Sequence, residues 1–259
     1  MVEMGRITVY IHPTCMSSYK LIKQLHLEGL LSKVGVRNTS RGAEAMERKI
    51  YSVPWVLMGD NPVATDPVSA GEIKELILSG SISVKSSPRD LFVNSIISSA
   101  FMAAQVLLRK DVRVALEREF LEAALRSRVG GYEPRVVVED VTGKGGELYE
   151  TLEPFLARSL AYSYVRELLW AKGLGSEPDF DIVSREEIVG SWILAKASIG
   201  RAFLPNKPVI VGHSGVEAIA EIVLEKGEAI ARSIREEQET IMRDEEYWNI
   251  LESLGVLGG

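Results

Sequence analysis

The chain has 259 residues and a mass of 28.6 kDa. This length exceeds the commonest size of one domain, so we expect two domains, each large enough to bury its own core. The formal net charge is −6 and the pI is near 5.3, which argues against a nucleic acid or an anionic membrane as the main partner. The single cysteine excludes an internal disulfide framework and a cysteine-rich metal site.

Three further features concern the cellular setting. No long apolar leader precedes Ile7, and together with the lone cysteine this favours a cytoplasmic location. The most apolar helix candidate, residues 91–108, carries several polar side chains and is short for a bilayer crossing, so we expect a buried helix and no membrane partner. Asn and Gln are scarce beside abundant Glu and Arg, which favours a thermophilic source.

The first 82 residues predict an α/β domain of alternating strands and helices. Ile7, Val9 and Ile11 have the two-residue period of a strand, and the apolar residues after Cys15 have the period of an amphipathic helix. In chain order we expect a strand at 6–11, a helix near 15–31, a strand at 33–39, a helix at 41–52, two strands around the turn at 59–61, and a helix opened by a capping box from Ser69 to Glu72. A parallel first pair extended by the hairpin gives a four-stranded mixed sheet with helices on its faces.

After a polar linker at 81–90, residues 91–259 predict an all-helical second domain. A β-branched run with several glycines at 131–150 predicts a loop or short hairpin, whereas apolar residues at every fourth position of 152–168 predict a helix. A long helix is expected at about 216–253. Its apolar residues recur at heptad spacing, which leaves two interpretations open. In one, they form the seam of a homodimer. In the other, the helix packs on its own bundle, and this is favoured because acidic residues fill the second apolar position that a dimer seam needs.

Cys15 lies where the first strand turns into the first helix, in the stretch ITVYIHPTCMSSYK. The unpaired N–H groups of Met16, Ser17 and Ser18 at the helix start favour a thiolate over a thiol. We also expect the Ser18 hydroxyl to hydrogen-bond the thiol. Because thiolates attack disulfides and electrophiles, Cys15 is the candidate nucleophile. The structural alternative is a small buried residue without a chemical role.

The order of elements in this first domain resembles the glutaredoxin form of the thioredoxin fold, and two motifs fall at matching places. PTCMSS resembles the C-x-x-C or C-x-x-S active site of that family, which implies Cys15 as the nucleophile and Ser18 in place of the second cysteine. SVPWV resembles the family's Val-Pro segment, which implies a cis Pro54 facing the thiol and a Val53 that offers its backbone to an extended substrate. The residues implied as catalytic or substrate-binding are Cys15, Ser18, Thr14, Met16, Val53 and Pro54.

A thioredoxin-like domain followed by a helical domain also resembles the layout of glutathione transferases and the larger glutaredoxins. In those enzymes a Glu-Ser pair at the third helix holds the glutamyl group of glutathione, whereas this chain has Asp66-Pro67-Val68-Ser69, which argues against glutathione itself. The resemblance implies no cofactor beyond a low-molecular-weight thiol. A cluster bridged between two subunits, as in monothiol glutaredoxins, is a further alternative, but Met16-Ser17 replaces that family's Gly-Phe.

Two functional hypotheses follow. In the first, the chain is a monothiol thiol–disulfide oxidoreductase or thiol transferase that acts through Cys15 on a small thiol or disulfide, or on a partner protein. Because Ser18 replaces a resolving cysteine, a second thiol must release the mixed disulfide. In the second, the chain is a non-catalytic binding or assembly protein whose helical domain holds a partner. An accessible Cys15 beside a cleft favours the first hypothesis, and a buried Cys15 with an apolar patch on the helical domain favours the second.

Overall fold

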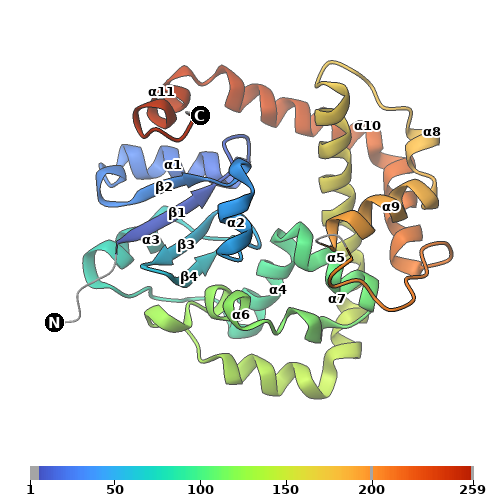
Figure 1. Cartoon of the computed structure of the whole chain (residues 1–259), viewed down its shortest axis with the longest axis horizontal. Coiled ribbons are helices and arrows are strands. Elements are labelled where there is room, and N and C mark those ends of the chain that lie inside the picture. Colours follow the sequence, from blue (N-terminus) through green and yellow to red (C-terminus); the bar gives the residue numbers. More distant parts are fainter. Residues whose placement is uncertain (1–5, 199–200, 258–259) are drawn as a thin grey trace. The chain divides into compact units, whose positions relative to one another are not determined.

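The computed structural model describes residues 6–198 and 201–257, and its elements are labelled in Figure 1. The chain forms two compact units, neither of which is continuous in sequence. The first unit comprises residues 1–95, 116–139 and 239–259, and the second comprises 96–115 and 140–238. This division differs from the predicted one, 1–82 and 91–259, because two later stretches of chain pack with the first 95 residues and not with the other helices.

The first unit is built on a four-stranded mixed sheet. Its strands lie in the spatial order β2-β1-β3-β4, with bounds β1 (Ile7–Ile11), β2 (Gly35–Asn38), β3 (Trp55–Met58) and β4 (Asn61–Thr65). β1 runs parallel to β2 and antiparallel to β3, and Val9 lies opposite both Val36 and Val56. β3 and β4 form an antiparallel hairpin. The mixed sheet and the hairpin predicted from the sequence are therefore confirmed.

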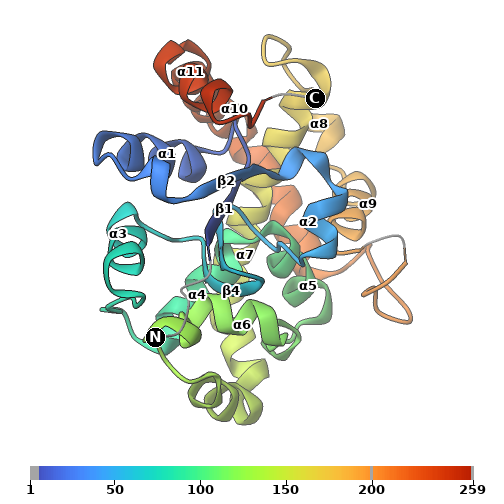
Figure 2. The ribbon, with the colours of Figure 1, turned by 60° about the vertical axis from the view of Figure 1, so that its left-hand side comes forward.

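Helices lie on both sides of this sheet. α1 (Met16–Leu27) and α3 (Ala70–Ser79) lie on one side, and the short α2 (Ala43–Glu47) lies on the other (Figure 2). The side chains of Val9, Ile11 and Val56 pack with apolar residues of α1 and α3 in a single core. Ser69 and Glu72 form the predicted capping box at the start of α3, each side chain accepting a hydrogen bond from the other residue's N–H.

A stretch of chain after residue 115 packs against β4, the edge strand of the hairpin. α6 (Arg118–Leu125) contacts β4, and the residue that follows it, Arg126, is 1% exposed. The Arg126 guanidinium donates to the carbonyls of Thr65, Pro67 and Ala124 and forms an ion pair with Glu72. One buried cation thus holds the end of β4, the turn after it and the first turn of α3 together.

The end of the chain packs on the opposite edge of the first unit. α11 (Glu245–Ser253) lies beside α1 (Figure 1), and Tyr247, Ile250 and Leu251 belong to the same apolar core as β1. Farther on, the Val256 carbonyl accepts a hydrogen bond from the Asn38 side chain at 3.4 Å, which ties the segment to the end of β2.

The second unit is formed by helices. These are α5 (Ala100–Arg109), α8 (Phe180–Val183), α9 (Glu186–Lys196), and the larger parts of α7 (Pro134–Lys172) and α10 (Ser214–Arg243). The predicted four-residue spacing along α7 is confirmed, because Leu152, Leu156 and Leu160 are buried. At Gly227 of α10 an added Cβ would lie 2.3 Å from the Phe180 ring, so glycine permits α8 and α10 to approach closely. Short 3-10 helices span Leu31–Lys33, Thr39–Arg41, Val112–Ala115 and Ser127–Val129.

The prediction of a loop or hairpin at 131–150 is wrong. From residue 134 onward this stretch belongs to α7, interrupted only by a kink at Lys144, where φ is −133° and ψ is 16°. The β-branched residues and glycines that suggested a loop each lower helix propensity by about 1 kcal/mol or less. Burial of Val137 and Val141 outweighs that preference.

Two helices predicted as continuous are broken by capping residues. The helix expected at 91–108 is α4 (Pro88–Ser98) followed by α5, and the Ser99 hydroxyl caps α5 by accepting the Met102 N–H at 3.2 Å. The helix expected at 216–253 is α10 followed by α11, and Asp244 caps α11. No single helix in the described ranges is long and apolar enough to cross a membrane; α4 and α5 reach that length and composition only together, with a bend of 98° between them.

Candidate functional site

Cys15 lies in the loop that leaves β1 and is the residue immediately before α1. Its backbone is extended, with φ −83° and ψ 126°, and it occupies the N-cap position of the helix. The Cys15 N–H donates to the His12 carbonyl at 3.0 Å, and the Cys15 carbonyl accepts from the Tyr19 N–H at 2.8 Å. The thiol is free, and the residue is half-buried. The predicted position of this cysteine at a helix N-terminus is therefore confirmed, next to N–H groups that have no partner within the helix.

The segment before β3 approaches the same thiol. The peptide bond between Val53 and Pro54 is cis, and Cys15 Sγ lies 3.8 Å from the Val53 carbonyl oxygen, to which it donates. The Pro54 carbonyl accepts from the Asp66 N–H at 3.0 Å, which fixes this segment to the end of β4. The fold thus brings together two motifs that are 38 residues apart in the sequence.

Ser18 makes a different hydrogen bond from the one predicted. It is fully buried in the first turn of α1, and its Oγ accepts from the His12 N–H at 3.3 Å. The hydroxyl therefore supports the loop that carries Cys15. The Thr14 hydroxyl lies 3.1 Å from His12 Nδ1, and the Met16 side chain packs against the apolar core. These three residues shape the loop around the thiol.

The C-terminal helix α11 supplies a residue that the sequence motifs do not reveal. Tyr247 is buried, and its hydroxyl donates at 2.9 Å to the carbonyl of Pro13, two residues before the thiol and 234 residues from Tyr247. Its ring packs edge-on against Tyr19, with the ring centroids 4.9 Å apart. Burial raises the pKa of Tyr247, so the hydroxyl remains a hydrogen-bond donor at neutral pH.

Asp244 holds α11 against the helix that begins at Cys15. Its carboxylate accepts from the Tyr19 hydroxyl at 2.8 Å and lies 3.0 Å from Lys23 Nζ. The same carboxylate caps α11 by accepting the Tyr247 N–H at 2.9 Å. Burial acts to raise the pKa of Asp244, but these hydrogen bonds outweigh it and hold the pKa below its ordinary value. The ionised carboxylate is thus the stable form in the folded chain.

A pocket of about 460 Å³ opens between α1 and the turn that leads from β4 to α3. The Ser17 hydroxyl lies 3.5 Å from the Asp66 carboxylate at one end of it. Polar groups of the lining are spaced among apolar ones, an arrangement that orients small ligands. The principal lining residues are Ser17, Lys20, Gln24, Asp66, Val68 and Glu72. Because Ser17 is two residues from Cys15, this pocket adjoins the loop that carries the thiol.

Within residues 6–198 and 201–257, no group of three or more His, Cys, Asp or Glu side chains is placed to hold a metal ion. No protein-family model, no curated protein and no solved structure matches the chain. The described chain thus combines a mixed α/β sheet, a following helical region, and a thiol held at the start of the first helix.

Proposed function

We propose that the chain is a monothiol thiol–disulfide oxidoreductase or thiol transferase of the thioredoxin-fold superfamily, with Cys15 as its nucleophile. The observation that carries the proposal is the 3.8 Å approach of Cys15 Sγ to the Val53 carbonyl, next to a cis Pro54. In thioredoxin folds the cysteine and the segment before the cis proline face each other in this way. The strand order β2-β1-β3-β4, with β3 antiparallel to its neighbours, supports the same assignment.

The chemistry of such a site is a two-step exchange. The Cys15 thiolate attacks one sulfur of a disulfide, forms a mixed disulfide with that half of the substrate, and expels the other half as a thiolate. A second thiol then attacks the substrate sulfur of the mixed disulfide, which forms a new disulfide and releases Cys15 as a thiolate. The second thiol comes from another molecule, because Cys15 is the only cysteine of the chain. The Val53 backbone offers main-chain hydrogen-bonding groups to an extended substrate.

Labelling of Cys15 tests the proposal directly, because a thiol-specific reagent can modify only this residue. We expect iodoacetamide at neutral pH to alkylate the native protein at least as fast as the urea-unfolded protein, since the reactive form is the thiolate at a helix start. Cys15→Ser serves as the control and should remain unlabelled. Bis(2-hydroxyethyl) disulfide is expected to transfer one half of itself to the native protein, and 2-mercaptoethanol to remove that half.

Two results would refute this function. One is labelling that begins only when the protein is unfolded, which would show that Cys15 is sequestered. The other is a mixed disulfide that no small thiol releases, because the second step of the exchange would then be blocked. Either result would direct attention to the alternative, a non-catalytic binding or assembly protein.

A further inference from the structure

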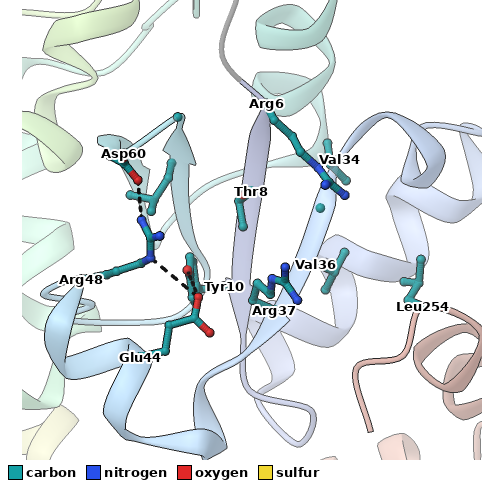
Figure 3. A pocket seen from close by; sticks show the side chains of 13 residues that line it. Arg6, Thr8, Tyr10, Val34, Val36, Arg37, Glu44, Arg48, Asp60 and Leu254 are labelled. Atoms are coloured by element: carbon teal, nitrogen blue, oxygen red, sulfur yellow. Dashed lines mark hydrogen bonds and ion pairs between the residues drawn. The ribbon is translucent and has the colours of Figure 1, made fainter. Parts of the chain in front are cut away.

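A second pocket, of about 280 Å³, lies on the side of the sheet that faces away from the apolar core (Figure 3). Side chains alternate along a strand, so the residues that alternate with the core-facing Ile7, Val9 and Ile11 point to this other side. They are polar or amphipathic: Thr8 and Tyr10 of β1, together with Arg37 of β2, line the pocket. α2 is only five residues long and leaves this part of the sheet uncovered.

The two carboxylates of the pocket already have partners. Arg48 lies 2.7 Å from the Asp60 carboxylate and 3.7 Å from the Glu44 carboxylate. The Tyr10 hydroxyl also donates to Glu44, at 2.7 Å. Burial and this hydrogen bond raise the pKa of Tyr10 to about 12, so the hydroxyl stays protonated at neutral pH. Glu44 and Asp60 thus share Arg48 on the α2 side of the pocket, as the dashed lines in Figure 3 show.

The other two arginines that line the pocket are Arg6, which precedes β1, and Arg37 of β2 (Figure 3). None of the ion pairs found in the described part of the chain involves either guanidinium. A chain with a formal net charge of −6 has ample carboxylates to neutralise two arginines. Their placement in one hollow, with no such partner among the residues that the structure describes, leaves positive charge available to a ligand.

Gly35 provides the floor between these groups. A Cβ added at Gly35 would lie 3.4 Å from Arg6 Nε, and 3.5 Å from both Arg6 Nη2 and the Thr8 hydroxyl. The guanidinium of Arg6 and the hydroxyl of Thr8 therefore converge above the glycine. Any larger residue at position 35 would occupy the space in which a ligand could meet both donors.

We propose that this pocket, here called the arginine pocket, binds the phosphate group of a small ligand between Arg6 and Arg37, with the Thr8 hydroxyl as a further donor. Guanidinium groups bind phosphate through paired N–H donors, and two of them match its double negative charge. The volume is below the usual range for drug-sized ligands, which favours inorganic phosphate or a short phosphate monoester over a nucleotide. The pocket does not include Cys15, so this proposal stands apart from the thiol chemistry.

Titration of the full chain with inorganic phosphate and with glycerol 3-phosphate tests the proposal. Calorimetry at low ionic strength should show saturable binding, and amide NMR signals of Thr8 and Gly35 should shift. Arg6→Gln and Arg37→Gln are each expected to weaken binding about tenfold or more, because each removes a charge-assisted hydrogen bond. Arg89→Gln is the matched control: it removes the same charge from an exposed position on α4, outside the pocket, and should bind phosphate as the unmodified chain does.

The two phosphate compounds also identify the source of the ligand. Tighter binding of glycerol 3-phosphate indicates an ester, and equal or weaker binding indicates the free ion; both support the pocket. Three results would overturn the proposal: shifts that sodium chloride reproduces at matched ionic strength, equal weakening in Arg89→Gln, or succinate binding as tightly as phosphate. Each would show screening or general anion attraction in place of phosphate recognition.

Discussion

Replacement of Arg126 by methionine is expected to lower the free energy of unfolding of the first unit by about 3–5 kcal/mol, the usual cost of removing one member of a buried ion pair. The guanidinium is 1% exposed and donates to the carbonyls of Thr65, Pro67 and Ala124. Methionine fills similar apolar space but donates no hydrogen bond, so three carbonyls lose a partner. Each unsatisfied buried acceptor costs about 1–3 kcal/mol, and least where water can enter and the site relaxes. Three acceptors at the low end of this cost account for about 3 kcal/mol, the lower end of the expected loss.

Urea unfolding combined with hydrogen exchange measures this loss within the correct unit. Two units need not unfold together, so exchange is followed in peptides covering residues 62–72 and 118–131. With a slope of about 3 kcal/mol per M, the midpoint should fall by about 1 M or more. Arg128→Met is the control, because Arg128 is 33% exposed and pairs with Glu122, an arrangement worth about 1 kcal/mol or less. Equal losses in the two variants would refute the argument from burial.

Two further predictions concern α11. Tyr247→Phe removes the hydrogen bond to the Pro13 carbonyl and should cost about 1 kcal/mol of stability and alter the alkylation rate of native Cys15; an unchanged rate would show that α11 does not support the thiol loop. The pKa of Asp244 is lowered in the folded chain, so its contribution to stability is complete above the ordinary carboxyl pKa of about 4 and is lost as pH falls through the lower folded value. Asp244→Asn should remove that acid-side loss from urea midpoints measured against pH, and identical profiles for the two proteins would contradict the assignment.

The sheet and its first helices could be predicted because their signals are local. The alternation at Ile7, Val9 and Ile11 and the capping box at Ser69 and Glu72 each lie within a few residues of sequence. The membership of α6 and α11 in the first unit could not be predicted. It depends on contacts such as that between Tyr247 and Pro13, which are 234 residues apart and leave no periodic trace in the sequence.

The candidate site was predicted in part for the same reason. Two short motifs located Cys15 and the segment at Val53 and Pro54, and the structure brings them within 3.8 Å of each other. The hydrogen bond of Ser18 could not be predicted from spacing alone, because the N–H of His12 competes for the same hydroxyl and the structure shows that pairing. Spacing identifies which residues share a helix face, but it does not choose among their partners.

The core of the first unit is not complete within the first 82 residues. Five aliphatic residues from the later segments belong to the same apolar cluster as β1 and α1: Val129, Ile241, Ile250, Leu251 and Val256. Full burial of such a side chain is worth about 1.5–3 kcal/mol, so together they contribute about 7–15 kcal/mol before entropy, comparable with the whole stability of a domain. The segment that carries α11 is therefore part of the unit that bears the thiol. Since Tyr247 of α11 also donates a hydrogen bond to the loop that leads to Cys15, α11 both completes this core and supports the loop that carries the thiol.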